Sequence, residues 1–295
     1  MSVIDEIKES FRKGTILHKL IYFNLGIFLT AQIVRIVLLL SNSGEGFLTF
    51  VDYLAVPANL EVLARRPWTL FSYMFLHVDF IHILFNLLWL YWFGTVFIQE
   101  LGIKKLLSTY LLGGLAGGLL YVVFYNAFSV FEPVREVSIA MGASASVMAI
   151  VVAAATYNPE RRMHLVFIGP VKIIYIALVM FIFTSLVDFS VNTGGKIAHI
   201  GGAFMGFIFA HYYKKGKDIT KGFQGLLDAI ATWFKPGKQK MKVTHKRSSD
   251  DFEYKREKVE EQKEIDKILD KISKAGYESL TSKEKELLFR MSDKK

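Results

Sequence analysis

The stretch Met141-Gly142-Ala143-Ser144-Ala145-Ser146-Val147-Met148 opens an apolar segment that runs to about residue 155. Its small residues leave the hydroxyl of Ser144 uncovered and let another backbone approach closely. A serine is a poor nucleophile unless an adjacent base activates it. The stretch therefore fits either a nucleophilic site or the small-residue face of a tightly packed membrane helix. A histidine that can reach Ser144 from elsewhere in the chain would favour the first interpretation.

The composition around this stretch is typical of a membrane protein. Hydrophobic residues make up 52% of the 295 residues, and the mean hydropathy is +0.33. They fall into long apolar runs separated by short polar breaks, which is the pattern of spanning helices. The chain has no cysteine, so disulfides, thiolate metal sites and a cysteine nucleophile are excluded.

Six apolar runs are candidate spans, at about residues 17–40, 78–98, 106–124, 141–155, 170–187 and 195–213. The sequence thus predicts an all-α membrane protein, a bundle of six transmembrane helices with a short central fourth helix and a hydrophilic helical C-terminal tail. We divide it into an N-terminal segment (1–16), a six-span domain (17–213) and a tail (214–295). We expect half-buried interfacial helices within residues 41–67, and Pro170 in the first turn of the fifth helix.

The fourth run is too short to cross a membrane unaided. At 1.5 Å per residue it would cover only ~22 Å, against a hydrocarbon core of ~30 Å. We therefore expect it to begin below the outer surface, inside a ring of longer helices.

Basic residues set the predicted orientation. With the N-terminus inside, most lysines and arginines of the short connecting segments lie on the inner side, as the positive-inside rule requires. The net charge of +9 is concentrated after the sixth run, and an even number of spans returns the tail to the same side. We expect both termini in the cytoplasm.

This orientation brings four polar residues to a similar shallow depth below the outer surface. His82 and Asn86 lie one and two turns into the second span and, at i and i+4, share a helix face. Ser144 lies about one turn into the fourth span, and His199 about one turn into the sixth. Unpaired polar groups are costly there, so we expect the four to share a watery cavity.

The sixth span has the spacing that would let His199 reach Ser144. Gly202 and Gly206 follow at i+3 and i+7, so this helix can lie against the alanine-rich fourth span. A general base must come within about 2.6–3.2 Å of the serine oxygen. The alternative is a small-residue packing contact beside a buried histidine that is bonded to a carbonyl.

With these residues in these spans, the chain resembles the rhomboid family of intramembrane serine proteases over about residues 15–213. The resemblance rests on four motifs: Gly142-Ala143-Ser144-Ala145, Ala198-His199-Ile200-Gly201-Gly202 with Gly206, Phe75-Leu76-His77 followed by His82-Ile83-Leu84-Phe85-Asn86, and Arg66-Pro67-Trp68-Thr69. Two positions depart from the family pattern. Ala145 stands where many members have glycine, and Met148 where many have an aromatic residue that packs on the catalytic histidine.

The resemblance implies a chemistry and a set of partners. It implies a Ser144–His199 dyad without a third acid, and an oxyanion hole built from His82, Asn86 and the Ser144 amide. It implies no cofactor and no metal. The substrates would be single-span membrane proteins that enter past the fifth span and residues 188–196, and the setting would be a bacterial cytoplasmic membrane. His77 could be a structural or supporting group or a directly catalytic one, and we favour the former.

The hydrophilic tail consists of stretches of different composition. Residues 222–234 are amphipathic, residues 235–247 are polybasic and suited to anionic lipids, and short helices follow at 260–272 and 281–291. The second of these helices opens with a Thr281-x-x-Glu284 capping box. No nucleic-acid partner is indicated.

The main alternative function is an inactive or weakly active rhomboid-like protein that binds transmembrane helices. A transporter is disfavoured because no inverted repeat is visible.

Overall fold

The computed structural model describes residues 14–165, 168–187, 192–233 and 249–292, and it divides the chain into two compact units, Met1–Phe234 and Lys235–Lys295. The predicted polybasic run and part of the loop at 188–196 lie outside the described residues. Within the described residues, three helices are long and apolar enough to cross a membrane: α2 (Ile16–Leu40), α6 (Phe80–Leu101) and α7 (Ile103–Ala127). Two shorter apolar helices are α9 (Ser144–Tyr157) and α10 (Ile173–Ser185). Helix α11 (Thr193–Lys214) covers the sixth apolar run of the sequence.

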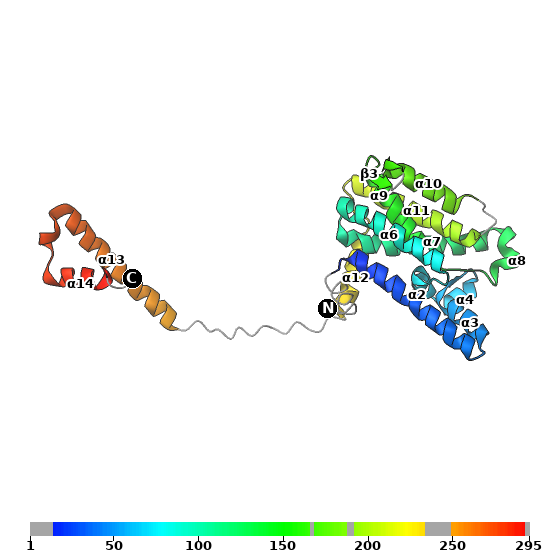
Figure 1. Cartoon of the computed structure of the whole chain (residues 1–295), viewed down its shortest axis with the longest axis horizontal. Coiled ribbons are helices and arrows are strands. Elements are labelled where there is room, and N and C mark those ends of the chain that lie inside the picture. Colours follow the sequence, from blue (N-terminus) through cyan, green and yellow to red (C-terminus); the bar gives the residue numbers. More distant parts are fainter. Residues whose placement is uncertain (1–13, 166–167, 188–191, 234–248, 293–295) are drawn as a thin grey trace. The chain divides into compact units, whose positions relative to one another are not determined.

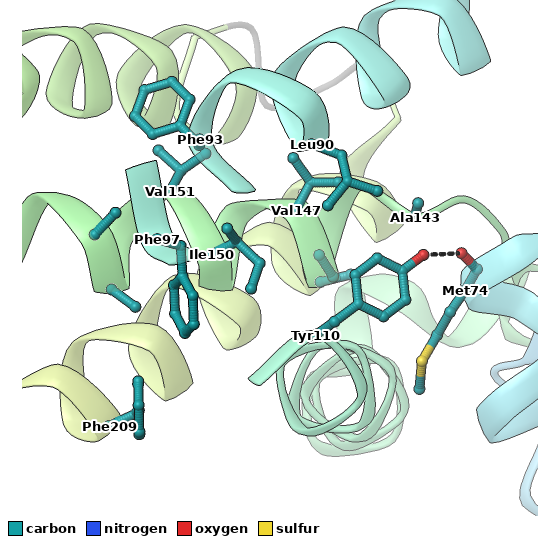
Figure 2. Packing of buried hydrophobic residues seen from close by; sticks show 14 of the residues in the cluster. Met74, Leu90, Phe93, Phe97, Tyr110, Ala143, Val147, Ile150, Val151 and Phe209 are labelled. Atoms are coloured by element: carbon teal, nitrogen blue, oxygen red, sulfur yellow. Dashed lines mark hydrogen bonds between the residues drawn. The ribbon is translucent and has the colours of Figure 1, made fainter. Parts of the chain in front are cut away.

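Helix α9 is the centre of the first unit. It contacts α6, α7, α10 and α11, whose ribbons surround it in Figure 1. Ten of its fourteen residues are buried, which confirms the expected short central helix. Figure 2 shows the core from close by, with Phe93 and Phe97 of α6 near Val151 and Ile150 of α9. A dashed line there marks the 3.1 Å hydrogen bond that the Tyr110 hydroxyl donates to the carbonyl of Met74.

Short elements fill the connection between the first two long helices. They are α3 (Gly44–Leu54), α4 (Leu60–Arg65), α5 (Thr69–Ser72) and the 3-10 helix η1 (Tyr73–Phe75). Helices are therefore present within residues 41–67, as α3 and α4, and their position at a membrane interface stays a prediction. Between α7 and α9 lie η2 (Ser129–Phe131) and α8 (Glu132–Arg135).

The part of the chain that the structure describes also contains four short strands, which the sequence did not predict and which form two antiparallel pairs. Strand β1 (Val56–Pro57) pairs with β2 (Ile139–Ala140), so the segment before α9 is tied to the connection between α2 and α6. Strands β3 (Arg162–Leu165) and β4 (Gly169–Lys172) form a hairpin between α9 and α10. The expectation for Pro170 was wrong: it lies in β4 opposite His164, because the hairpin delays the start of α10 to Ile173.

The remaining helices follow α11. Helix α12 (Lys221–Trp233) covers the predicted amphipathic stretch and contacts α7. The second unit contains α13 (Ser249–Ala275), the 3-10 turn η3 (Tyr277–Ser279) and α14 (Ser282–Ser292). The predicted capping box is present, since the Thr281 amide donates to Glu284 at 2.7 Å and the Glu284 amide donates to the Thr281 hydroxyl at 3.4 Å.

Candidate active site

Ser144 is the first residue of α9, not a residue one turn inside the helix as expected. The helix begins late because Gly142 has a φ of 122°, a conformation that favours glycine, and its amide donates a 2.8 Å hydrogen bond to the carbonyl of Tyr73. The amides of a first helical turn have no acceptor within the helix, and this end of a helix carries a partial positive charge. The backbone amide of Ser144 therefore has no acceptor within its own helix.

His199 lies in the second turn of α11 and is held by α10. Its Nδ1 is 3.0 Å from the carbonyl oxygen of Thr184. A carbonyl can only accept, so Nδ1 carries the hydrogen in this contact and a neutral ring keeps its lone pair on Nε2. A backbone carbonyl therefore orients His199 in the tautomer that a general base needs.

Glycines bring the helices of Ser144 and His199 together. A Cβ at Gly202 would overlap the carbonyl oxygen of Ala145, and a Cβ at Gly206 would overlap that of Ala149. A Cβ at Gly117 of α7 would lie 2.6 Å from both the Cβ of Ala145 and the carbonyl oxygen of Ala198. The neighbours of Ser144 and of His199 therefore meet at one point.

The two side chains are not joined by a hydrogen bond within the described part of the chain. Such catalytic contacts are often long in a substrate-free enzyme and shorten when substrate binds. Met148, one turn below Ser144, is fully buried.

His82 and Asn86 share one face of α6, as their spacing predicted. The Asn86 side chain donates to the His82 carbonyl at 2.9 Å. The ring of His82 faces Gly142, where an added Cβ would lie 2.7 Å from Cε1. Asp79 caps the helix by accepting from the His82 amide at 2.7 Å. The structure thus brings His82 against the backbone that leads into Ser144.

His77 connects this face of α6 to the same backbone. It is fully buried, and its Nδ1 is 3.2 Å from the carbonyl of Phe75. By the same argument as for His199, Nε2 is an acceptor. It accepts from the Ala143 amide at 3.2 Å and lies 3.3 Å from the Asn86 side-chain nitrogen. Sequence spacing alone did not reveal this bridging position.

The described residues contain no group of three or more histidine, aspartate or glutamate side chains that could hold a metal ion. The side chains and backbone groups described above are hydroxyl, imidazole and amide groups, the kinds of group that acyl-transfer chemistry uses.

Comparison with known proteins places the chain in a family. The sequence model of the rhomboid domain matches residues 64–216, and that of a family of unknown function (DUF6576) matches residues 249–294. RHOMBOID-like protein 12, mitochondrial, of Arabidopsis thaliana is 30% identical over 162 residues, which are 52% of this chain and 48% of that protein. Rhomboid protease GlpG of Pectobacterium atrosepticum is 33% identical over 90 residues, 30% of this chain and 32% of that protein.

A second GlpG, from Salmonella typhi, is 34% identical over 83 residues, which are 28% of this chain and 30% of that protein. The chain thus spans about half the length, or less, of the curated relatives it matches. The rhomboid-domain match covers more than half of this chain and contains the residues of the site described above. Together with the apolar helices, it identifies an integral membrane protein that belongs to the rhomboid family.

Proposed function

We propose that this protein is an intramembrane serine endopeptidase that cleaves single-span membrane proteins with a Ser144–His199 dyad. The observation that carries the proposal is the position of His199. Its Nδ1 is bound to the Thr184 carbonyl at 3.0 Å, which leaves Nε2 as a base, and its helix packs through Gly202 on the residue after Ser144. Thr184 supplies by its backbone the orientation that an acid supplies in a triad.

The reaction would take place in two halves. Nε2 of His199 accepts the hydroxyl proton of Ser144 while Oγ attacks the carbonyl carbon of the scissile peptide. The same proton then passes to the leaving amine, and water hydrolyses the ester that remains on Ser144. No group beyond the dyad and water is needed for proton balance.

The oxyanion would bind to three donors: the Ser144 amide, the Asn86 side chain and a ring nitrogen of His82. Support comes from the place of Ser144 at the start of α9 and from the contact of His82 with Gly142. His77 would act as a positioning residue, since its Nε2 contacts both the Ala143 amide and Asn86. Preorganised donors of this kind are usually the largest single contribution to catalysis.

The proposed topology has six spans, α2, α6, α7, α9, α10 and α11, with both termini in the cytoplasm of a bacterium. The division into residues 1–16, 17–213 and 214–295 is part of this proposal. The polybasic run at 235–247 would bind anionic lipids at the inner surface. The supporting observation is the charge distribution of the sequence.

The test is cleavage of a panel of single-span substrates by the full chain in lipid vesicles. Ser144→Ala and His199→Ala should each abolish cleavage while membrane insertion is unchanged. A fluorophosphonate should label Ser144 and spare Ser146, which is 1% exposed and faces Gly114 of α7. Ser146→Ala is the matched control and should remain active. Cleavage at the wild-type rate by either dyad variant would refute the proposal. Binding of substrates without cleavage by the wild type would favour the alternative, an inactive rhomboid-like protein.

A further inference from the structure

An apolar groove of about 420 Å³ lies between α10 and α11, with α9 at its bottom. Ala177 and Phe181 come from α10, Ala203 and Phe207 from α11, and Ala155 from α9. The alanines are nearly inaccessible, whereas Phe207 is 48% exposed. The groove therefore has a floor of small residues and aromatic walls that open outward.

The groove is separate from the candidate active site. The hydrogen bond between His199 and Thr184 joins α10 to α11 at the end of both helices nearest Ser144. Phe181 lies one turn before Thr184 in α10, and Ala203 lies one turn after His199 in α11. The groove thus extends from that bond toward the opposite ends of the two helices.

A lysine lies near the far end of the groove on each wall. Thr156 lines the groove, and its carbonyl accepts a 3.3 Å hydrogen bond from Nζ of Lys214. Lys172 precedes Ile174, the first lining residue of α10, by two positions, and it pairs with Glu160 at 2.7 Å. An ammonium group has three hydrogens to donate. Lys214 can therefore bind an anionic oxygen while it keeps its contact with Thr156.

The groove is lined almost wholly by apolar side chains, with small alanines at its floor. A flexible hydrocarbon chain can enter such a space and contact the buried alanines.

We propose that this groove is a binding site for an anionic phospholipid, with one acyl chain between α10 and α11 and its phosphate on Lys214. Apolar walls match the chain, and the cation at the mouth matches the headgroup. Each lysine near an anionic lipid surface contributes on the order of 1 kcal/mol, equivalent to about fivefold in affinity. The bound lipid would hold α10 against α11 independently of any hydrolytic activity.

The test is native mass spectrometry of the full chain after reconstitution with equal amounts of phosphatidylglycerol and phosphatidylcholine. Wild-type protein should retain one phosphatidylglycerol. Lys214→Gln should lower its retention about fivefold. Lys215→Gln, the same charge change one residue on and without the contact that Lys214 makes with the groove-lining Thr156, should leave it unchanged. Ala203→Leu fills the floor of the groove and should abolish retention. If this variant does not fold, the comparison of Lys214→Gln with Lys215→Gln still tests the proposal.

A phosphatidylglycerol with a photoreactive acyl chain would show where on the protein the lipid binds. Its adducts should map to peptides that contain Phe181 or Phe207. Equal loss of lipid in the two lysine variants would overturn the proposal, as would adducts confined to other helices. Unchanged lipid retention combined with weaker substrate cleavage in Ala203→Leu would assign the groove to a substrate helix and would equally overturn it.

Discussion

Replacement of Gly202 by alanine tests whether the contact between α9 and α11 sets the geometry of the dyad. Gly202 follows His199 by three residues and faces the backbone of Ala145, the residue after Ser144. The added methyl group would overlap the carbonyl oxygen of Ala145. Because that obstacle is backbone and not the end of a flexible side chain, the two helices must separate, by roughly 1 Å, before the methyl group fits.

Two energies oppose each other in this substitution. Alanine is favoured over glycine in a helix by ~1 kcal/mol, whereas overpacking of a tight contact costs ~1–3 kcal/mol. The net loss of stability should therefore be at most ~2 kcal/mol. A displacement of ~1 Å in a catalytic group can cost ~10²-fold in rate. We expect activity to fall much more than stability.

The assay compares kcat/KM for a single-span substrate and the thermal midpoint of the variant with those of the wild type in the same vesicles. Gly26→Ala in α2 is the matched control, since an added Cβ there meets no atom within 4 Å. It should keep full activity and lose no stability. Wild-type kcat/KM in Gly202→Ala would refute the reasoning, because the close approach of α9 and α11 would then have no bearing on the reaction.

Three further predictions follow from individual contacts. Asn86→Ala should lower kcat by about 10²-fold with little effect on substrate binding, since an oxyanion donor acts mainly in the transition state; normal kcat with a much lower melting temperature would make it a packing residue. His77→Ala removes the acceptor of the Ala143 amide, so we expect a loss of ~1–2 kcal/mol in stability together with a lower kcat, and wild-type values of both would exclude a positioning role. The Lys271 side chain and hydrogen bonds from Thr281 lower the pKa of Glu284 from 4.5 to about 2. The stability that this carboxylate contributes is therefore complete above pH 4.5 and disappears as the pH falls toward 2, which NMR titration of Glu284 in wild type and Lys271→Met can measure.

The sequence predicted what depends on local composition. Apolar runs located the helices, and the depth of Ser144, His199, His82 and Asn86 within their runs pointed to one site. The spacing of Gly202 and Gly206 predicted a close helix contact, and the structure has that contact with the backbone of α9.

What the sequence could not predict depends on pairing between distant residues. Strands β1 and β2 join Val56 to Ala140, and two-residue strands have no alternation to detect. The pairing of β1 with β2 lies just before Gly142, and α9 begins only after it, at Ser144. The bridge through His77 depends on which ring nitrogen carries the hydrogen, and this follows from the nearby Phe75 carbonyl, not from the order of residues in the sequence.

The error in the expected start of α9 bears on how the proposed site would function. A helix that began at Met141 would use the Ser144 carbonyl and amide in its own hydrogen bonds, and the serine would lie on the side of the helix. By beginning at Ser144, the helix leaves the amide beside the nucleophile free of intrahelical bonds. Its fourteen residues span only ~21 Å, less than the ~30 Å hydrocarbon core. In the proposed topology this amide would therefore lie below the outer surface, where a low dielectric constant would strengthen its interaction with an oxyanion. A single feature, the turn at Gly142, would thus provide both the depth of the site and a donor for the transition state.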